Sequence, residues 1–239
     1  MTMAIIDGDV LVYMAIWKSE SLEEAKTKFQ GLLDDVLNSL FTKDYVMAIG
    51  GPDNFRLDLF PEYKGNRKKA KDTRPEWFDD LKSWASKLEG SVESDNCEAD
   101  DLVRVWALEC NAAGINCAVV SVDKDLHCIV GTHYNPRTKK IYQIDEEYAG
   151  RFYWQQVLTG DSVDAIPGLW KVGPVKAKAM LKGAVTSKEM RDVACRAYHD
   201  AYGDEGYAYL IANGRLIHIW RHVNDYFKIR KEVYESAIA

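Results

Sequence analysis

Carboxylates crowd the start of one predicted helix and follow the ends of three predicted strands. The helix start carries Glu98, Asp100 and Asp101, and the strand ends carry Asp7, Asp53, Asp123 and Asp125. Two like charges about 4 Å apart repel by roughly 4 kcal/mol at an effective dielectric constant of about 20, so without a cation several of these groups would have to take up protons. All-oxygen ligand sets suit Mg²⁺ or Mn²⁺. We therefore interpret the acids as ligands for divalent metal ions.

Each carboxylate alone has a purely structural explanation. An Asp after a strand commonly forms a turn or caps the next helix, and Asp95 with Glu98 fits a capping-box pattern. The functional interpretation depends on the whole set, because parallel strands gather their carboxyl ends at one edge of a sheet. Glu98 and Asp101 also share one helix face at i, i+3 spacing. His127 and Cys128 are expected to pack in a strand and not to bind metal.

Strands and helices are predicted to alternate through the first part of the chain. Apolar runs predict strands at residues 3–6, 45–49 and 117–122, and a hairpin or two edge strands at 127–132 and 140–144. Helical spacing of apolar residues predicts helices at 21–41, from Pro75 to about 88, from about 96 to 113, and through most of the chain after about 146. This order indicates βαβ units and a central, mostly parallel sheet flanked by helices.

Composition sets broad limits on the class of protein. The chain has 239 residues, 47% of them hydrophobic, which is enough for a real core. It shows no apolar run long enough to span a membrane and no signal-peptide pattern at its start. Five scattered cysteines without CxxC spacing predict reduced thiols and a cytoplasmic location, the host cytoplasm for a phage protein, and argue against a zinc site. The net charge of -6 is weak evidence against a nucleic-acid partner, because charge is segregated along the chain.

Positive charge is concentrated in one short segment after the second predicted strand. Its cations are Lys64, Arg67, Lys68, Lys69, Lys71 and Arg74. Such a run is usually a solvated loop, but beside an acidic metal site we expect it to hold the phosphates of a single strand. Phe60 and Tyr63 are close enough in sequence to stack on bases, whereas Trp77 is expected to pack in the core.

Five motifs in a fixed order connect these residues to a known family. They are IDGD at 6–9, NFRLDLFPEYKGNR at 54–67, CEADD at 97–101, SVDKDL at 121–126 and GDSVDAIPGLWKVGPVKA at 160–177. Together they resemble the 5′-nucleases, which are the flap endonucleases and 5′→3′ exonucleases of bacteriophages and of the N-terminal domains of bacterial DNA polymerase I. The resemblance implies a PIN-like α/β core over 1–159 with a short basic arch segment near 61–76. A helical DNA-binding region over 160–239 would follow, with a helix–three-turn–helix element near 160–183, and the two are expected to form one compact unit.

The resemblance also assigns roles to individual residues. It implies that two metal ions are held by Asp7, Asp53, Glu98, Asp100, Asp101, Asp123, Asp125, Asp161 and Asp164, the last two being the pair usually assigned to the second metal. Asp53 is included as the only acid at its position, where the loop is shorter than in many relatives. Lys64 and Arg67 match the catalytic basic residues that face the scissile phosphate or the 5′ strand. The implied DNA-binding residues are Arg56, Lys68, Lys69, Lys71, Gly168, Gly173, Val175 and Lys176.

The glycine-rich segment after Asp164 matches the helix–three-turn–helix element, which grips the backbone of duplex DNA, with a monovalent cation such as K⁺. Glycines before a helix let its backbone N–H groups approach a phosphate, and Pro174 suits a first helical position. Backbone contacts imply recognition of the shape of a junction, with little reading of base sequence.

The expected function is metal-dependent hydrolysis of DNA phosphodiester bonds by a structure-specific 5′-nuclease, in replication or repair. Two divalent ions can activate a water and stabilise the leaving oxygen, and Lys64 would offset charge on the phosphate oxygens. We expect a monomer that acts on DNA with a 5′ flap, a nick or a 5′ end, with RNA–DNA hybrids as a further class. Two alternatives stay open: a PIN-type ribonuclease that cuts single-stranded RNA, and a DNA-junction binder without catalysis.

Overall fold

The chain divides into two compact units. The computed structural model describes residues 2–65 and 73–239. Unit 1 comprises the described residues of Met1–Phe55, Ala70–Ile144 and Ile219–Val223, and unit 2 comprises those of Arg56–Lys69, Asp145–His218 and Asn224–Ala239. Each unit is therefore made of segments that are separate in the sequence: unit 1 includes one short segment near the C-terminus, and unit 2 includes one near residue 60.

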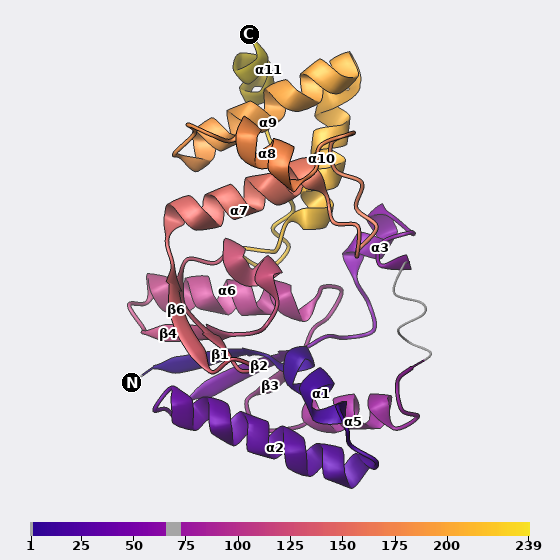
Figure 1. The fold of residues 1–239 in the computed structure, drawn as a ribbon, viewed down its shortest axis with the longest axis vertical. Helices are drawn as coiled ribbons and strands as arrows, with labels where there is room; N and C mark the ends of the chain where they lie inside the picture. The colour runs from indigo at the N-terminus through magenta and orange to yellow at the C-terminus, as the bar shows by residue number, and fades with distance from the viewer. Residues whose placement is uncertain (1, 66–72) are drawn as a thin grey trace. The chain divides into compact units, whose positions relative to one another are not determined.

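Unit 1 is built on a six-stranded sheet (Figure 1). Its strands are β1 (Met3–Asp7), β2 (Tyr45–Ile49), β3 (Ser91–Glu93), β4 (Cys117–Val120), β5 (Gly131–Asn135) and β6 (Lys140–Ile144). The strand order is β3-β2-β1-β4-β5-β6, and each neighbouring pair is parallel except the antiparallel pair β5 and β6. The prediction of a mostly parallel sheet is confirmed, and the inner strand β1 carries Asp7 at its carboxyl end.

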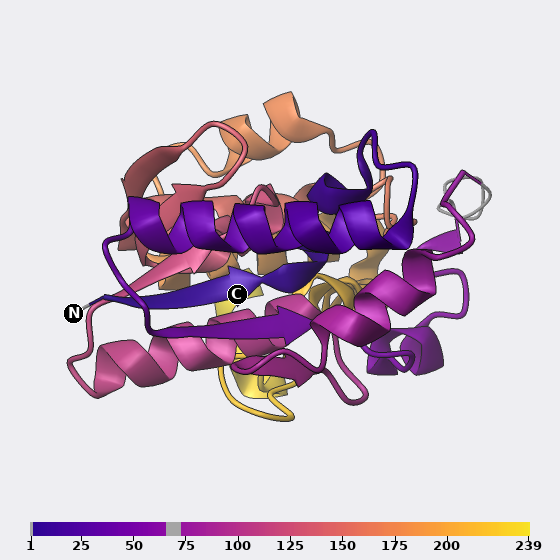
Figure 2. The same ribbon diagram turned by 90° about the horizontal axis from the view of Figure 1, so that it is seen from below.

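Helices cover both faces of this sheet (Figure 2). The helices α1 (Gly8–Ile16), α2 (Leu22–Ser39) and α5 (Phe78–Ala85) lie on one face, and α6 (Ala99–Ala112) packs on the other, against β1, β2 and β4. Ile6 and Met47 share a buried apolar cluster with Phe29 and Leu81 on the first face. Because both faces are buried, the central strands are apolar at nearly every position and show no alternation.

The segment after β4 differs from the prediction. Residues 127 and 128 lie in η2 (Lys124–Cys128), a 3₁₀ helix, and β5 begins only at Gly131. The carboxylate of Asp123 caps η2 by accepting a hydrogen bond from the backbone N–H of Asp125 at 2.9 Å. A side chain that bonds the local backbone in this way competes with strand pairing, so the predicted strand at 127–132 is wrong in its first part.

Two helix starts also differ from the prediction. Pro75 precedes α5, which begins at Phe78, because the backbone N–H of Phe78 closes a turn on the Pro75 carbonyl at 2.9 Å. The capping box of α6 pairs Glu98 with Asp101 and not Asp95 with Glu98. The acidic start of α6 therefore supplies its own cap.

Unit 2 is helical around its own apolar core. Its helices are α3 (Phe55–Leu59, which starts at the last residue of a unit 1 segment), α7 (Glu146–Thr159), α8 (Pro174–Met180), α9 (Ser187–Tyr202), η3 (Gly203–Glu205), α10 (Gly206–Ile217) and α11 (Lys231–Ile238). Trp154, Leu158, Met190 and Leu210 belong to the buried cluster that joins them. The predicted helical C-terminal region is thus confirmed, with Pro174 at the first position of α8 as expected. In the part of the chain that the structure describes, no helix combines the length and the apolar character needed to cross a membrane.

Candidate active site

Two of the predicted acids meet at the carboxyl edge of the sheet in unit 1. Asp7 ends β1, and Asp123 follows β4, which pairs with β1 in parallel. The hydroxyl of Ser121 joins them, because it donates to the Asp7 carboxylate at 2.8 Å and accepts from the backbone N–H of Asp123 at 2.9 Å. The strand order therefore brings together residues that are far apart in the sequence.

The carboxylate of Asp7 is poorly accommodated as an anion. Its side chain is 4% exposed, and its pKa is raised to about 7, chiefly by burial and then by the charge of Asp9, with a smaller contribution from Asp123. Hydrogen bonds from Ser121 and from the backbone N–H of Val10 oppose this rise in pKa. A buried carboxylate beside like charges is the arrangement that a bound cation relieves. These oxygen donors therefore fit a hard divalent ion.

The structure adds Asp9, to which the sequence analysis gave no role. Its carboxylate accepts a hydrogen bond from the backbone N–H of Gly50 at 3.2 Å and lies 3.5 Å from the Lys82 ammonium. Among the charged neighbours that raise the pKa of Asp7, it contributes most. Its place in the IDGD motif, two residues after Asp7, was the available signal.

The start of α6 brings further acids to the same unit. Glu98 is the N-cap and accepts a hydrogen bond from the Asn54 amide at 2.8 Å. Asp100 and Asp125 both raise the pKa of the Cys128 thiol, after the larger effect of burial, so η2 and the start of α6 are close enough to interact electrostatically. Glu98, Asp100 and Asp125 are all half-buried, as solvent-reachable ligands should be.

Two predicted ligands of unit 1 have surroundings that differ from those of the other acids. Asp53 is exposed in the segment after β2, and its side chain makes no hydrogen bond or ion pair with any other described residue. Asp101 is fully buried, and its two carboxylate oxygens accept hydrogen bonds from the backbone N–H groups of Glu98 and Trp220, each at 2.9 Å.

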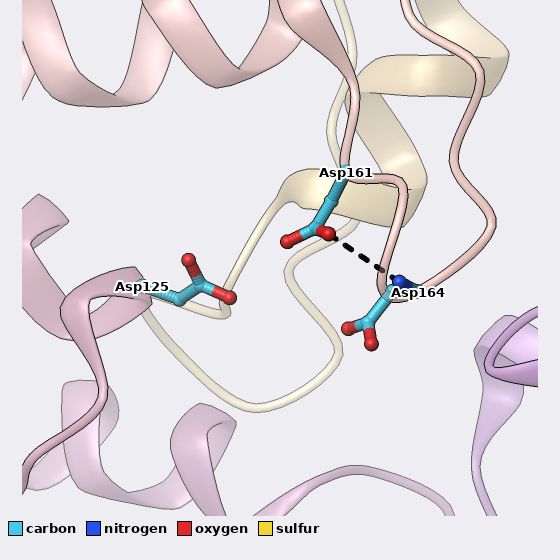
Figure 3. Close-up of side chains that lie close together, drawn as sticks. All are labelled: Asp125, Asp161 and Asp164. Carbon is cyan, nitrogen blue, oxygen red and sulfur yellow. Dashed lines mark hydrogen bonds between the residues drawn. The ribbon is translucent and has the colours of Figure 1, made fainter. Parts of the chain in front are cut away.

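Unit 2 holds a second group of predicted site residues. Asp161 and Asp164 lie on one turn, where the Asp161 carboxylate accepts backbone N–H hydrogen bonds from Val163 at 2.7 Å and from Asp164 at 3.3 Å (Figure 3). The Lys64 ammonium lies 3.9 Å from the Asp164 carboxylate, and the Lys64 N–H donates to the Asp164 carbonyl at 3.0 Å. Asp125, which Figure 3 also labels, belongs to unit 1. The YKGNR and GDSVD motifs are thus in direct contact within unit 2.

Several predicted nucleic-acid ligands have structural roles instead. Arg56 is 2% exposed, and its guanidinium donates to the backbone carbonyls of Leu216 at 3.1 Å and His218 at 2.6 Å, so it is not a surface DNA ligand. Tyr63 is 5% exposed and packs in the core of unit 2, which excludes the predicted base stacking. Arg74 packs over the Phe78 ring at 4.4 Å.

Four predicted basic ligands lie outside the described residues. These are Arg67, Lys68, Lys69 and Lys71.

The glycine-rich segment of unit 2 contains two different kinds of glycine. Gly168 is buried with φ of 64°, its N–H donates to the Asn213 side chain at 3.2 Å, and a Cβ there would overlap the backbone of Gly160. Its role is therefore close packing of two turns, and the prediction that it contacts DNA is corrected. Gly173 caps α8 with φ of -93°, and a Cβ there would meet nothing within 4 Å. Val175 and Lys176 beside it are exposed.

Comparison with known proteins extends these observations. Residues 2–154, more than half of the chain, match the family model of the 5′-3′ exonuclease, N-terminal resolvase-like domain. DNA polymerase I of Pseudomonas aeruginosa is 30% identical over 210 residues, which cover 76% of this chain and 22% of that protein. DNA polymerase I of Rhizobium leguminosarum is 30% identical over 138 residues, 54% of this chain and 14% of that protein. The chain therefore spans about a fifth or less of these polymerases.

A relative of similar size is also found. Flap endonuclease Xni of a Shewanella species is 25% identical over 191 residues, which cover 74% of this chain and 73% of that protein.

Solved structures share the fold. The bacteriophage T5 flap endonuclease, in a pseudo-enzyme-product complex with DNA and metal ions, matches with a TM-score of 0.71 over 91% of this chain and 89% of that one, at 17% identity. The bacteriophage T5 5′-exonuclease with bound zinc ions gives a TM-score of 0.72 over the same shares. The catalytic core of Rad2 with a DNA substrate gives 0.51 over 83% of this chain and 66% of that one, at 13% identity. Because this family model matches more than half of the chain, the chain belongs to the 5′-3′ exonuclease family with an N-terminal resolvase-like domain.

Proposed function

We propose that this protein is a divalent-metal-dependent, structure-specific 5′-nuclease that hydrolyses DNA phosphodiester bonds. The observation that carries the proposal is the buried Asp7 carboxylate, whose pKa is raised to about 7 among other acids. An ionised carboxylate at this position does little to stabilise the fold, because burial and like charges both oppose its ionisation. Perturbed carboxylates of this kind mark functional sites. Family membership makes a nuclease the most economical explanation.

The proposed ligands form one set in each unit. Unit 1 supplies Asp7, Glu98, Asp100, Asp123 and Asp125, and unit 2 supplies Asp161 and Asp164. Carboxylate oxygens favour Mg²⁺ or Mn²⁺ over softer ions. When bound, two such ions would activate the attacking water and stabilise the leaving oxygen. We propose that both sets are needed for cleavage.

Several residues of the chain would act around the phosphate. Lys64 is half-exposed, and its backbone N–H and its ammonium both contact Asp164, so its charge lies beside a proposed metal ligand and would offset charge that develops on phosphate oxygens. Ser121 holds the Asp7 carboxylate in one orientation by its 2.8 Å hydrogen bond. The metal-ligand residues would thus be pre-oriented before substrate binds.

We propose that the exposed start of α8 contacts duplex DNA. Gly173 has an ordinary φ and open space around its Cα, so no contact within the described chain requires glycine there. A close approach by a phosphate would explain it, with Val175 and Lys176 beside the contact and K⁺ as the expected monovalent cation. Such backbone contacts would select junction shape.

The proposed substrates are DNA with a 5′ flap, a nick or a 5′ end, and RNA–DNA hybrids as a further class. A relative of similar size is named a flap endonuclease, and two of the similar structures contain DNA. We propose a monomer that acts in the cytoplasm. The alternatives are a ribonuclease for single-stranded RNA and a non-catalytic junction binder, and the similar flap endonucleases support DNA cleavage over both of them.

The test is one set of 5′-labelled substrates: flap, nicked, blunt, RNA–DNA hybrid and single-stranded RNA, each with Mg²⁺, Mn²⁺ or EDTA. We expect metal-dependent cleavage of the flap or nicked DNA near its 5′ end. Cleavage of single-stranded RNA alone would favour the ribonuclease. Tight binding of flap DNA without turnover in either metal would favour the junction binder and overturn the proposal.

A further inference from the structure

A short segment from the C-terminal part of the chain packs on the acidic start of α6. Ile219–Val223 belongs to unit 1, whereas the residues on both sides of it belong to unit 2. Its contacts with α6 and with Phe55 all lie within unit 1. The sequence analysis found no motif in this region, so its role has to come from its contacts.

The segment is tied to α6 by hydrogen bonds at both of its first two residues. The backbone N–H of Trp220 donates to Asp101 Oδ1 at 2.9 Å. The Arg104 guanidinium, one helical turn further along α6, donates to the Ile219 carbonyl at 2.7 Å. The Trp220 ring is 2% exposed and stacks on Phe55, with centroids 5.4 Å apart and planes 12° from parallel.

Both carboxylate oxygens of Asp101 accept hydrogen bonds from backbone N–H groups. Its other oxygen, Oδ2, accepts the backbone N–H of Glu98 at 2.9 Å, which closes the capping box at the start of α6. The side chain has no exposed surface. Asp100, the next residue back, is half-buried instead, so the two neighbouring acids have different surroundings. A carboxylate whose two oxygens already accept backbone N–H groups is well suited to fixing the chain.

We propose that Asp101 is a positioning residue and not a metal ligand, and that it orients Glu98 and Asp100 by clamping the start of α6 to the segment Ile219–Val223 through Trp220. The segment then acts as a strap from the C-terminal part of the chain. Loss of the strap would loosen the first turn of α6, and the carboxylates that this turn carries would lose their fixed geometry. A small displacement of ligands is enough to lower the rate of a positioned reaction.

The test is a double-mutant cycle with Asp101→Asn and Trp220→Ala. An Asn turns its NH₂ group toward one of two backbone N–H donors, so one clamp bond is lost whichever way it is oriented. Asp101→Asn removes a hydrogen bond of the clamp, whereas Trp220→Ala keeps the backbone N–H and removes the ring that holds the segment against Phe55. Each single variant should lower kcat for flap DNA about tenfold, with KM unchanged, and the double variant should be no worse than either, because both changes release the same segment from α6. Trp220→Phe should restore most of the rate, because it keeps the stacking on Phe55. Trp17→Ala, a change at an exposed tryptophan, is the matched control.

Two readouts do not depend on cleavage, whereas the kcat comparison rests on the proposed function. Affinity for Mn²⁺, measured by calorimetry without DNA, should fall in both single variants by the same factor. Hydrogen exchange of the amides of residues 98–103 should be faster in both. If the wild type cleaves no DNA, the proposed function fails, and these two readouts still decide the role of the strap.

The proposal is overturned if the two effects multiply in the double variant, or if Trp220→Ala keeps wild-type Mn²⁺ affinity while Asp101→Asn loses it. Either result would make Asp101 act by itself, as a ligand does. If circular dichroism shows that Trp220→Ala is unfolded, the cycle is run with Arg104→Met, which removes the bond to the Ile219 carbonyl and leaves the aromatic stacking intact.

Discussion

Ser121 donates its hydroxyl hydrogen to the Asp7 carboxylate at 2.8 Å. This bond connects the turn after β4 to the end of β1, and it favours the ionised form of Asp7 by lowering its pKa. Burial and the charges of Asp9 and Asp123 outweigh it. The metal-free protein therefore carries an unfavourable carboxylate at the centre of its candidate site, and several measurable properties depend on it.

Replacing this carboxylate should stabilise the metal-free protein. The pKa of Asp7 is about 7 in the folded chain and near 3.8 in the unfolded chain. The folded state therefore binds more protons between these values, and stability falls as pH rises from about 4 to about 7. Asp7→Asn should raise the free energy of unfolding by about 2–4 kcal/mol at pH 8 in EDTA, and by little at pH 4. Urea unfolding at both pH values measures this, and equal or lower stability of the variant at pH 8 would refute it.

Metal affinity should depend on the same proton. A divalent ion competes with the proton on Asp7, so Mn²⁺ affinity should rise about tenfold per pH unit below pH 7 and level off above it. Calorimetry from pH 5.5 to 8.5, in buffers of different ionisation enthalpy, reports both the affinity and the released proton. Asp7→Asn is the control, since it should bind more weakly with a shallower pH dependence. A flat profile for the wild type would show that Asp7 is not a ligand.

Lys64 should affect chemistry more than folding. Its ammonium is half-exposed and lies 3.9 Å from Asp164, so its loss removes little packing. Lys64→Met should lower kcat on flap DNA by about 10²-fold or more, by analogy with the loss of a charge-stabilising donor, and Lys64→Arg should retain part of the rate. Lys188→Met, at an exposed position on α9, is the matched control. A kcat within twofold of the wild type would remove Lys64 from the reaction.

Gly168 and Gly173 of the GDSVDAIPGLWKVG segment should respond in opposite ways to the same change. Gly168→Ala introduces a Cβ at φ of 64° that overlaps the Gly160 backbone, so it should destabilise unit 2 by about 2 kcal/mol or more. Gly173→Ala meets open space at φ of -93°, so its melting temperature should stay close to that of the wild type while affinity for duplex DNA falls. Melting curves and DNA titrations in Ca²⁺ separate the two. A destabilised Gly173→Ala variant would point to packing and not to DNA.

Much of the sheet and its acidic edge could be predicted from local patterns. The apolar runs that became β1, β2 and β4 are buried on both faces, which is the condition that makes such runs recognisable. Because these strands are parallel, the acids after them had to gather at one edge, and Asp7 and Asp123 meet there.

The remaining features depend on partners that are remote in sequence. Arg56 belongs to a predicted motif, yet its guanidinium is buried and donates hydrogen bonds to backbone carbonyls about 160 residues further along the chain. In the sequence Asp101 cannot be told from its neighbour Asp100. The difference comes from Trp220, 119 positions away, whose backbone N–H donates a hydrogen bond to Asp101. In such cases no local pattern distinguishes a residue that binds metal or DNA from one that holds the backbone in place, because tertiary hydrogen bonds make the difference.

The most direct measurement is cleavage of 5′-flap DNA by the wild type and by Asp7→Asn across a Mg²⁺ titration, with EDTA as the blank. We expect the Asn variant to keep the fold, because it removes a carboxylate whose ionisation burial opposes, so a loss of activity would report chemistry. We predict no cleavage in EDTA, cleavage by the wild type in Mg²⁺, and a rate at least about 10²-fold lower for Asp7→Asn at saturating metal. Cleavage that persists in EDTA, or equal rates for the two proteins, would contradict a nuclease whose acids hold divalent ions.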